Sequence, residues 1–215
     1  MAYHRTESSE KKREKRHAKI VSVAQKLFAS KGVAGTTVQD IVSAAGTSIG
    51  NFYFYFENKE ELINEIVGGS LQDAYQMAES LMPKVPAGPA RLAVIVFCNA
   101  KVLVGHDSKV LPILRQTGAN IVAEYVMTRN AEFLQGHLRS NFPDIAEDQY
   151  TLISEAWTGV GRAAIVSVIS KAELTSSESE KMVVFMLRYN LRALRVPDAE
   201  IESAIAAARD IVPAL

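Results

Sequence analysis

Apolar side chains recur every three or four positions from residue 37 to residue 81, which is the spacing of one face of a helix. Two interruptions divide this pattern into three helices. Gly46 ends the first, because glycine adopts the left-handed conformation of a helix C-terminus without a Cβ penalty. Asn58, followed three residues later by Glu61, marks the start of the third. The positions expected on the buried faces are Val38, Ile41, Val42, Ala45, Ile49, Phe52, Phe56, Leu62, Ile63, Ile66 and Val67.

The first two of these helices are short and are joined by a tight turn. Thr36 and Gln39 have the spacing of a capping box, which predicts that the first helix begins near residue 37. Thr47 or Ser48 can cap the second helix. Two short amphipathic helices with aromatic side chains on the outer face of the second are typical of a helix-turn-helix that reads DNA. The positions expected to point outward are Ser48, Gly50, Asn51, Tyr53 and Phe54.

Helical periodicity continues to the end of the chain. Gly68 and Gly69 lie inside the third helix, where each costs on the order of 0.5–1 kcal/mol relative to alanine, and they predict a bend. A group of prolines from Pro83 to Pro89 ends this helix. No segment alternates convincingly as a strand does, so the sequence predicts an all-α fold. Further helices are expected at about 89–105, 108–117, 120–141, 147–171, 177–195 and 198–211.

The composition indicates one small and one medium globular domain, since the chain has 215 residues and 48% of them are hydrophobic. The longest apolar run, residues 92–98, is far shorter than the about 20 residues of a membrane span. The basic N-terminus lacks the apolar stretch of a signal peptide. We therefore expect a cytoplasmic protein without a membrane segment. Cys98, the single cysteine, excludes an intramolecular disulfide and a cysteine-cluster metal site, and we expect it to be a buried, inert thiol.

Overall neutrality conceals a strong separation of charge. Residues 1–56 carry 9 Lys and Arg against 4 Asp and Glu, a net charge of +5, whereas residues 57–215 carry 15 against 20, a net charge of −5. The basic segment can lie along a DNA backbone or enter a minor groove as a flexible arm. It can also be only a solvated polar tail, since three glutamates dilute its charge. Its basic residues are Lys11, Lys12, Arg13, Lys15, Arg16 and Lys19.

The sequence offers little chemistry for an enzyme. Residues 46–50 spell G-x-S-x-G, but the nucleophile elbow of a serine hydrolase needs a preceding strand, and the preceding residues here are helical in period. The four histidines lie in the N-terminal segment or far apart, and no metalloprotease, P-loop or dinucleotide motif accompanies them. We expect no catalytic residues, no metal site and no cofactor.

The motif-bearing part of the chain, roughly residues 16–66, resembles the N-terminal domain of the TetR/AcrR family of bacterial transcriptional regulators. The resemblance is close in residue type and spacing. Ile49 and Phe54 depart from it, because they stand where that family often has polar or basic residues, so no operator sequence can be carried over. The residues that carry the resemblance are Ile20, Ala24, Leu27, Phe28, Gly32, Phe52, Tyr53, Tyr55, Phe56, Lys59 and Glu60.

The resemblance implies two domains, a basic segment with a three-helix helix-turn-helix domain at 1–62 and a helical effector-binding and dimerisation domain at 63–215, with about nine helices. In a helix-turn-helix, the start of the second helix meets base edges and the flanking groups hold phosphates. We expect Ser48, Asn51 and Phe54 at base edges, with Gly50 allowing close approach. The full set of expected DNA contacts is Thr36, Thr37, Ser48, Ile49, Gly50, Asn51, Tyr53, Phe54 and Lys59, of which Thr37, Tyr53 and Lys59 are the expected phosphate contacts.

Two further sites are expected in the second domain. Small residues on one stripe of helix 147–171, and a large apolar surface on helix 177–195, favour a dimer interface over ordinary packing within one chain. Bulky and polar residues on the central helices are candidates for an effector pocket. The expected interface residues are Gly159, Ala163, Ser167, Met182, Phe185, Met186 and Tyr189. The expected pocket residues are Phe97, His106, Tyr125, Met127, Phe133, Trp157 and Arg162.

The sequence therefore predicts a ligand-responsive transcriptional regulator. We expect a homodimer that binds a palindromic double-stranded DNA operator, usually to repress, and that a small-molecule effector releases. The alternatives are a helical DNA-binding protein without effector control, and an enzyme that uses a cavity of the helical domain. The effector, the operator and the regulated genes are not written in the sequence.

Overall fold

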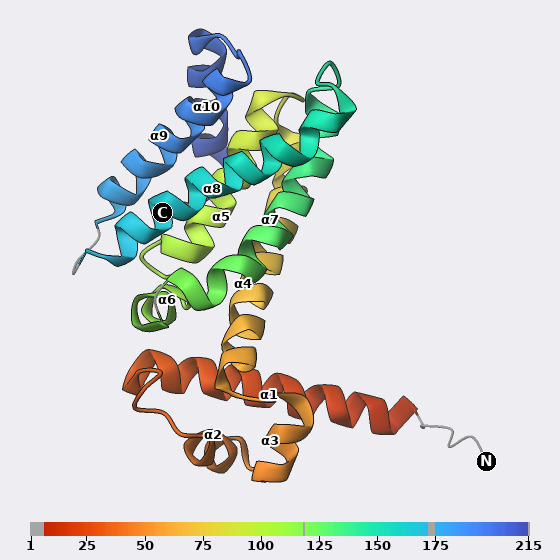
Figure 1. Ribbon diagram of the computed structural model, residues 1–215, viewed down its shortest axis with the longest axis vertical. Coiled ribbons are helices and arrows are strands. Elements are labelled where there is room, and N and C mark those ends of the chain that lie inside the picture. Colours follow the sequence, from red (N-terminus) through yellow and green to blue (C-terminus); the bar gives the residue numbers. More distant parts are fainter. Residues whose placement is uncertain (1–6, 118, 172–174, 215) are drawn as a thin grey trace. The chain divides into compact units, whose positions relative to one another are not determined.

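The computed structural model describes residues 7–117, 119–171 and 175–214, with the backbone alone for residues 7, 8 and 119–126. The described residues form ten α-helices and two 3-10 turns without a strand, which confirms the predicted all-α class. They group into two compact units that divide between Ile66 and Val67. Figure 1 shows the helices of each unit.

The first unit consists of α1 (Glu7–Lys31), α2 (Val38–Ala45), α3 (Ile49–Tyr55) and the start of α4 (Lys59–Leu81). Its core forms where the apolar faces of these helices meet. Gly46 ends α2 in the left-handed conformation, with φ of 66°, as predicted. The buried side chains of this core are Ile20, Ala24, Phe28, Ile41, Val42, Ala45, Phe52, Phe56, Leu62, Ile63 and Ile66.

The predicted start of α2 is wrong by one residue. Thr37, not Thr36, is the N-cap, and its hydroxyl oxygen accepts a hydrogen bond from the backbone N–H of Asp40 at 3.1 Å. The carboxylate of Asp40 accepts in return from the backbone N–H of Thr37, which completes the capping box and lowers the pKa of Asp40. Thr36 is fully buried, and its hydroxyl donates to the carbonyl of Gly32 at 2.7 Å.

The basic N-terminal segment is helical where the structure describes it. α1 begins at Glu7, so the basic residues from Lys11 to Lys19 continue the helix and do not form the flexible arm that was one of the expectations. Lys, Arg and Glu are favourable residues for an exposed helix, which explains why the segment can extend α1 without burying apolar surface. Every one of the six basic side chains in this segment is exposed.

The second unit continues α4 and adds α5 (Pro89–Val104), α6 (Leu111–Thr117), α7 (Ala119–Asn141), α8 (Tyr150–Ile169), α9 (Ser176–Ala193) and α10 (Asp198–Ile211). The 3-10 turns are Met82–Lys84 and Glu147–Gln149. The predicted helices are confirmed, except that α6 and α8 each begin three residues later than expected, and a 3-10 turn takes the place of the predicted start of α8. The hydroxyl oxygen of Ser108 accepts from the backbone N–H of Leu111, the first residue of α6, at 3.0 Å.

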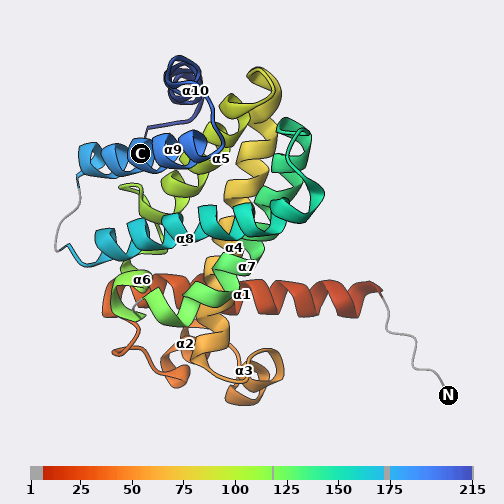
Figure 2. The ribbon, with the colours of Figure 1, turned by 45° about the horizontal axis from the view of Figure 1, so that its top comes forward.

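α5 is the central helix of the second unit and contacts α7, α9 and α10 (Figures 1 and 2). Most of its side chains are buried, which explains the unbroken apolar run at 92–98. Cys98 is buried in this run, and burial raises the pKa of its thiol to about 12, so it is the inert thiol that the sequence predicts.

α4 is a single α-helix that passes through Gly68 and Gly69. A side chain added at Gly69 would meet nothing within 4 Å. Packing therefore does not require a glycine at this position. A bending role for the pair stays a prediction.

α8 is apolar but poorly covered. By length and composition alone, Glu147–Ile169 is the one segment of the described chain that could cross a membrane. Only 22% of its most apolar window is buried inside the protein. Exposed apolar side chains on a helix of a folded unit are also what an interface between subunits presents.

Candidate functional site

α3 is held in place by its first turn and by two buried rings. The hydroxyl oxygen of Ser48 caps the helix by accepting from the backbone N–H of Asn51 at 3.2 Å. The side-chain amide of Asn51 donates to the hydroxyl of Thr47 at 2.9 Å. Phe52 and Phe56 are buried in the core of the first unit and fix the rotation of α3.

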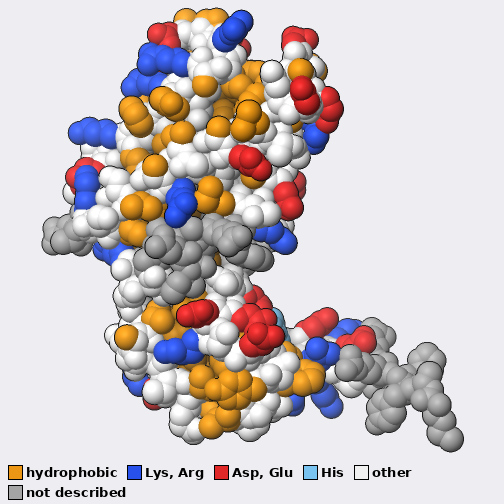
Figure 3. Space-filling model, in the orientation of Figure 1, with side chains coloured by type: hydrophobic (Ala, Val, Ile, Leu, Met, Phe, Trp, Pro, Cys, Tyr) orange, Lys and Arg blue, Asp and Glu red, His pale blue; other side chains and the backbone are white. Residues whose placement is uncertain are grey.

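The outer face of α3 is apolar and aromatic. Tyr53 and Phe54 are 56% and 58% exposed, as predicted. Ile49 is 46% exposed, so the prediction that it is buried is wrong. As the first residue of a two-turn helix, Ile49 precedes the turn that packs on α2, and Phe52 and Phe56 alone supply the buried face. Gly50 is exposed as well. Figure 3 shows hydrophobic side chains gathered over α3.

Arg13 joins the basic segment of α1 to α3. Its guanidinium carbon lies 4.8 Å from the centroid of the Phe54 ring, within the range of a cation–π interaction. The hydroxyl of Tyr55 donates to the backbone carbonyl of Arg13 at 3.2 Å. The exposed cations of α1 and the exposed rings of α3 are therefore parts of one surface of the first unit, which we call the α1–α3 surface.

Two predicted DNA contacts have other roles in the structure. The ammonium of Lys59 donates to the carbonyls of Val33 at 3.0 Å and Thr36 at 2.9 Å, so it closes the loop between α1 and α2. Thr36 is buried and cannot present its hydroxyl to a phosphate. Both predictions are corrected on this geometry. Thr37 remains exposed at the N-terminus of α2.

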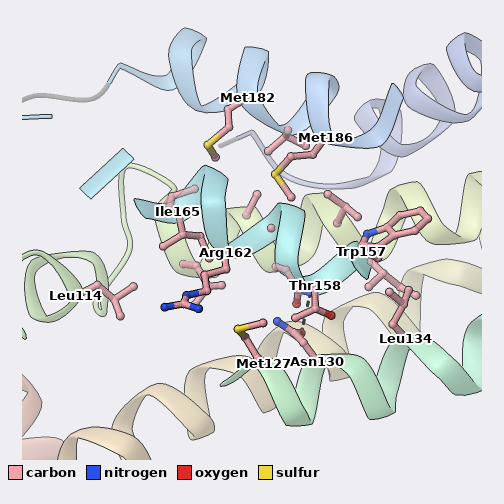
Figure 4. Close-up of a pocket in the computed structure, with 18 of the residues that line it drawn as sticks. Leu114, Met127, Asn130, Leu134, Trp157, Thr158, Arg162, Ile165, Met182 and Met186 are labelled. Atoms are coloured by element: carbon pink, nitrogen blue, oxygen red, sulfur yellow. Dashed lines mark hydrogen bonds between the residues drawn. The ribbon is translucent and has the colours of Figure 1, made fainter. Parts of the chain in front are cut away.

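A cavity of about 120 Å³ lies in the second unit between α5, α7, α8 and α9 (Figure 4). Three of the predicted pocket residues, Met127, Trp157 and Arg162, line it. Phe97 is buried elsewhere in α5, and Phe133 is stacked on Tyr75 with ring centroids 4.1 Å apart.

Two predicted pocket residues remain, His106 and Tyr125. His106 is exposed and pairs with Asp107 at 3.0 Å, because it follows the end of α5 and does not face the interior. The side chain of Tyr125 lies outside the described residues. Sequence reasoning missed Asn99, Asn130 and Thr158, and also the described apolar lining residues Val67, Ile95, Val96, Ala100, Leu103, Val104, Leu114, Leu134, Gly161, Ile165, Met182, Val183 and Met186.

The predicted dimer residues fall into two groups. Ala163, Ser167, Phe185 and Tyr189 are exposed on α8 and α9, and Gly159 is half-buried. Met182 and Met186 instead line the cavity, which corrects their assignment. Their spacing of four residues places both on one face of α9, and that face borders the cavity. The sequence analysis also missed Leu152 and Val166, which are exposed apolar residues on α8.

The first unit has the geometry of a helix-turn-helix protein, with a capped pair of short helices and the second of them exposed along its outer face. Residues 20–66 match the family described as bacterial regulatory proteins, tetR family. Over these residues the chain carries the N-terminal domain of this family of bacterial regulatory proteins.

Two curated relatives are similar to about half of the chain. The HTH-type transcriptional repressor KstR2 of Rhodococcus jostii (strain RHA1) is 30% identical over 122 residues, which are 55% of this chain and 59% of the relative. The HTH-type transcriptional regulator TtgR of Pseudomonas putida is 32% identical over 101 residues, which are 45% of this chain and 48% of the relative. The chain thus spans about half the length of the curated relatives it matches.

Solved structures extend the likeness to the second unit. A crystal structure of RolR with its ligand resorcinol has a TM-score of 0.63 at 18% identity and covers 95% of this chain and 98% of RolR. A TetR-family regulator from Pectobacterium atrosepticum has a TM-score of 0.65 at 14% identity, covering 88% of this chain and 95% of that chain. At these identities the likeness concerns the fold.

Proposed function

We propose that the chain is a transcriptional regulator that binds a palindromic DNA operator as a homodimer, represses the adjacent genes and is released by a small molecule. The observation that carries this proposal is the α1–α3 surface, which joins exposed cations on α1 to exposed side chains on α3. Cations supply affinity for the phosphate backbone, and side chains on a short exposed helix supply contacts to base edges. The family match and the repressor KstR2 support the same function.

The contacts that we assign follow from exposure. Tyr53 and Thr37 are free of the core and are proposed phosphate contacts, as are the cations of α1. Ile49, Gly50 and Phe54 form the proposed base-reading face. Asn51 and Ser48 make local hydrogen bonds within the turn. The side-chain amide of Asn51 keeps a second N–H and its oxygen for a base, and the hydroxyl of Ser48 keeps its proton and a second lone pair.

Dimerisation is proposed through the exposed faces of α8 and α9. Phe185 and Tyr189 stack on each other with ring centroids 6.4 Å apart and are 65% and 57% exposed. Figure 3 shows hydrophobic side chains on this side of the second unit, bordered by Lys and Arg. Covering two exposed rings stabilises a dimer, and a palindrome requires two recognition helices spaced by about 34–36 Å or a multiple of it.

The cavity in the second unit is the proposed effector site. An effector that favours a conformation unfit for the operator would release DNA. The coupling would be about 1–3 kcal/mol and reciprocal, so DNA would weaken effector binding by the same factor. Such a regulator acts where the chromosome is, so we also propose that the protein is cytoplasmic.

The test is a gel-shift titration with the DNA upstream of the protein's own gene. We expect Tyr53→Ala to weaken binding to every sequence variant of this DNA, and Asn51→Ala to relax the preference at one base pair. Far-ultraviolet circular dichroism of both variants checks that the fold is retained. Unchanged operator affinity in both variants would reject the assignment of α3 as the recognition helix.

A further inference from the structure

The size of the cavity in the second unit limits what it can bind. Its volume is about 120 Å³. An apolar protein cavity of roughly 150 Å³ accepts benzene, whereas pockets for drug-sized molecules measure about 300–1,000 Å³. This volume therefore matches a single six-membered ring with a short substituent.

The side chains around the cavity favour an aromatic ring. Figure 4 shows Met182 and Met186 reaching in from α9, Met127 from α7 and Trp157 from α8. Thioether sulfurs make favourable contacts with aromatic rings, and an indole offers its face or edge to another ring. Methionine also adapts its shape, so these three side chains can close around a flat molecule.

The polar groups at the cavity leave one hydrogen-bond acceptor unused. The side-chain amide of Asn99 donates to Oδ1 of Asn130 at 3.3 Å, and the same oxygen accepts from the hydroxyl of Tyr75 at 2.7 Å. The hydroxyl of Thr158 donates to the carbonyl of Ser154 at 2.8 Å. Within the described part of the chain, Oδ1 of Asn99 is buried without a hydrogen-bond partner. A buried acceptor without a partner is unfavourable, so a ligand that donates to it gains affinity.

The charge of the lining excludes an ionised ligand from the interior. No acidic side chain is among the described residues that line the cavity, so an ammonium group would be buried without a counter-ion. Arg162 is the one cationic side chain in the described lining, and it is exposed. A carboxylate among the buried, mostly apolar side chains of the described lining would therefore lose hydration without a charged partner beside it.

We propose that this cavity binds an uncharged, single-ring aromatic molecule that carries a hydrogen-bond donor, and that the donor bonds to Oδ1 of Asn99. The regulatory meaning of this binding rests on the function proposed above, because an effector must also release DNA. The binding itself does not depend on DNA.

The first experiment measures four small probes against the full chain without DNA. Phenol, toluene, benzoate and benzylamine share one ring and differ in donor and charge. Calorimetry gives the dissociation constants, and the fluorescence of Trp157, the single tryptophan, reports binding at this cavity. We expect phenol to bind roughly tenfold more tightly than toluene, and the two charged probes to bind more weakly than phenol. The proposal is overturned if no probe binds, if toluene equals phenol, or if a charged probe binds most tightly.

Two variants test whether the preference for phenol depends on Asn99 and whether the probes bind in this cavity. Asn99→Leu removes the acceptor at similar volume, so phenol and toluene should then bind about equally. Ala100→Phe fills the cavity from α5 and should abolish binding of all probes. A preference for phenol that survives Asn99→Leu contradicts the assignment of the acceptor. If Asn99→Leu does not fold, the probe series on the natural chain together with Ala100→Phe still decides whether the cavity and its donor preference are real.

A DNA-binding measurement separates this proposal from the function proposed above. If phenol binds with the expected preference and does not release operator DNA, the ligand class stands and the effector role is wrong. If the chain binds no specific DNA, the regulator function fails while the probe series still judges the ligand class. If phenol releases DNA from the natural chain but not from Asn99→Leu, both are supported.

Discussion

The guanidinium of Arg13 lies over the ring of Phe54, with its carbon 4.8 Å from the ring centroid. This contact links a helix that carries most of the positive charge of the first unit to the helix proposed to read bases. The backbone carbonyl of Arg13 also accepts the Tyr55 hydroxyl, so side chain and backbone bind the two helices together. We therefore expect electrostatic affinity and base reading to depend on the same residue.

Replacing Arg13 should weaken DNA binding mainly through charge. We expect Arg13→Met to lower the slope of log affinity against log salt concentration by about one, because one phosphate contact is lost. The exposed cation–π contact adds about 0.5–1 kcal/mol. Fluorescence anisotropy titrations at several salt concentrations measure the slope. Lys84→Met, which removes one exposed cation from the second unit, is the matched control and should leave the slope unchanged. An equal slope for Arg13→Met and the natural chain would contradict this role.

The exposed side chain of Phe54 should read a thymine methyl group, since an apolar contact in the major groove distinguishes thymine. Replacing one operator thymine by uracil removes that methyl and should cost roughly fourfold in affinity, as expected for about 0.8 kcal/mol. In Phe54→Ala the same replacement should have no effect. Ile49→Ala should show the same behaviour at a different thymine. If uracil weakens binding equally in the natural chain and in both variants, these side chains do not read methyl groups.

Lys59 should stabilise the first unit and not contact DNA. Its ammonium donates to two loop carbonyls, and it is half-buried. We expect Lys59→Met to lower the free energy of unfolding by about 1–3 kcal/mol, because two carbonyls lose a charged donor. Chemical denaturation measures this loss. The salt dependence of DNA binding should stay the same. A variant of unchanged stability with a reduced salt slope would restore the phosphate contact that the sequence suggested.

The exposed rings on α9 should hold the dimer together. Phe185→Glu places a charge in the proposed interface, and we expect the dimer dissociation constant to rise by at least thirtyfold, which corresponds to about 2 kcal/mol. Sedimentation equilibrium measures the change. Ala206→Glu on the exposed side of α10 is a control with the same added charge and should not alter association. If Phe185→Glu remains a dimer of unchanged strength, the interface lies elsewhere.

The N-terminus of α9 should lose stability in acid. The backbone N–H of Thr175, its hydroxyl and the ammonium of Lys171 all bond to Glu178, and they lower its pKa from the ordinary 4.5 to about 2. A lowered pKa in the folded state means that the stabilisation is complete above 4.5 and disappears as the pH falls toward about 2. Thermal unfolding of Glu178→Gln should differ from the natural chain above 4.5 and converge with it below about 2.

The control for this pH dependence is Glu132→Gln, which removes an exposed carboxylate from α7. It should not reproduce the convergence. A constant difference between Glu178→Gln and the natural chain over the whole acid range would show that the capping contacts of Glu178 do not stabilise α9.

Local patterns were enough to predict most of the fold. Each helix depends on its own periodicity, caps and breakers, and these act within a few residues, as at Gly46 and Pro89. The error at Lys59 arose because a distant contact decided the outcome. The position of Lys59 depends on carbonyls 23 and 26 residues earlier in the chain, so spacing could not distinguish a loop contact from a phosphate contact.

The cavity was the least predictable part of the chain. Its described lining comes from six helices, and the rotation of each about its axis decides which side chains line it. Asn99 gives no local signal, because an asparagine in an apolar helix is noticed only when its partner on another helix is known. The spacing of Met182 and Met186 did place both on one face, although the sequence could not say that this face looks inward.

Selection of fragments of the source genome by binding to the full chain tests the central claim most directly. Fragments retained at physiological salt are sequenced, and their affinities are measured against a scrambled duplex of equal length. We predict a small set of fragments that share an inverted repeat and bind with roughly a thousandfold or greater preference over the scrambled duplex. Retention of fragments without a common inverted repeat, and with no preference over the scrambled duplex, would contradict the account.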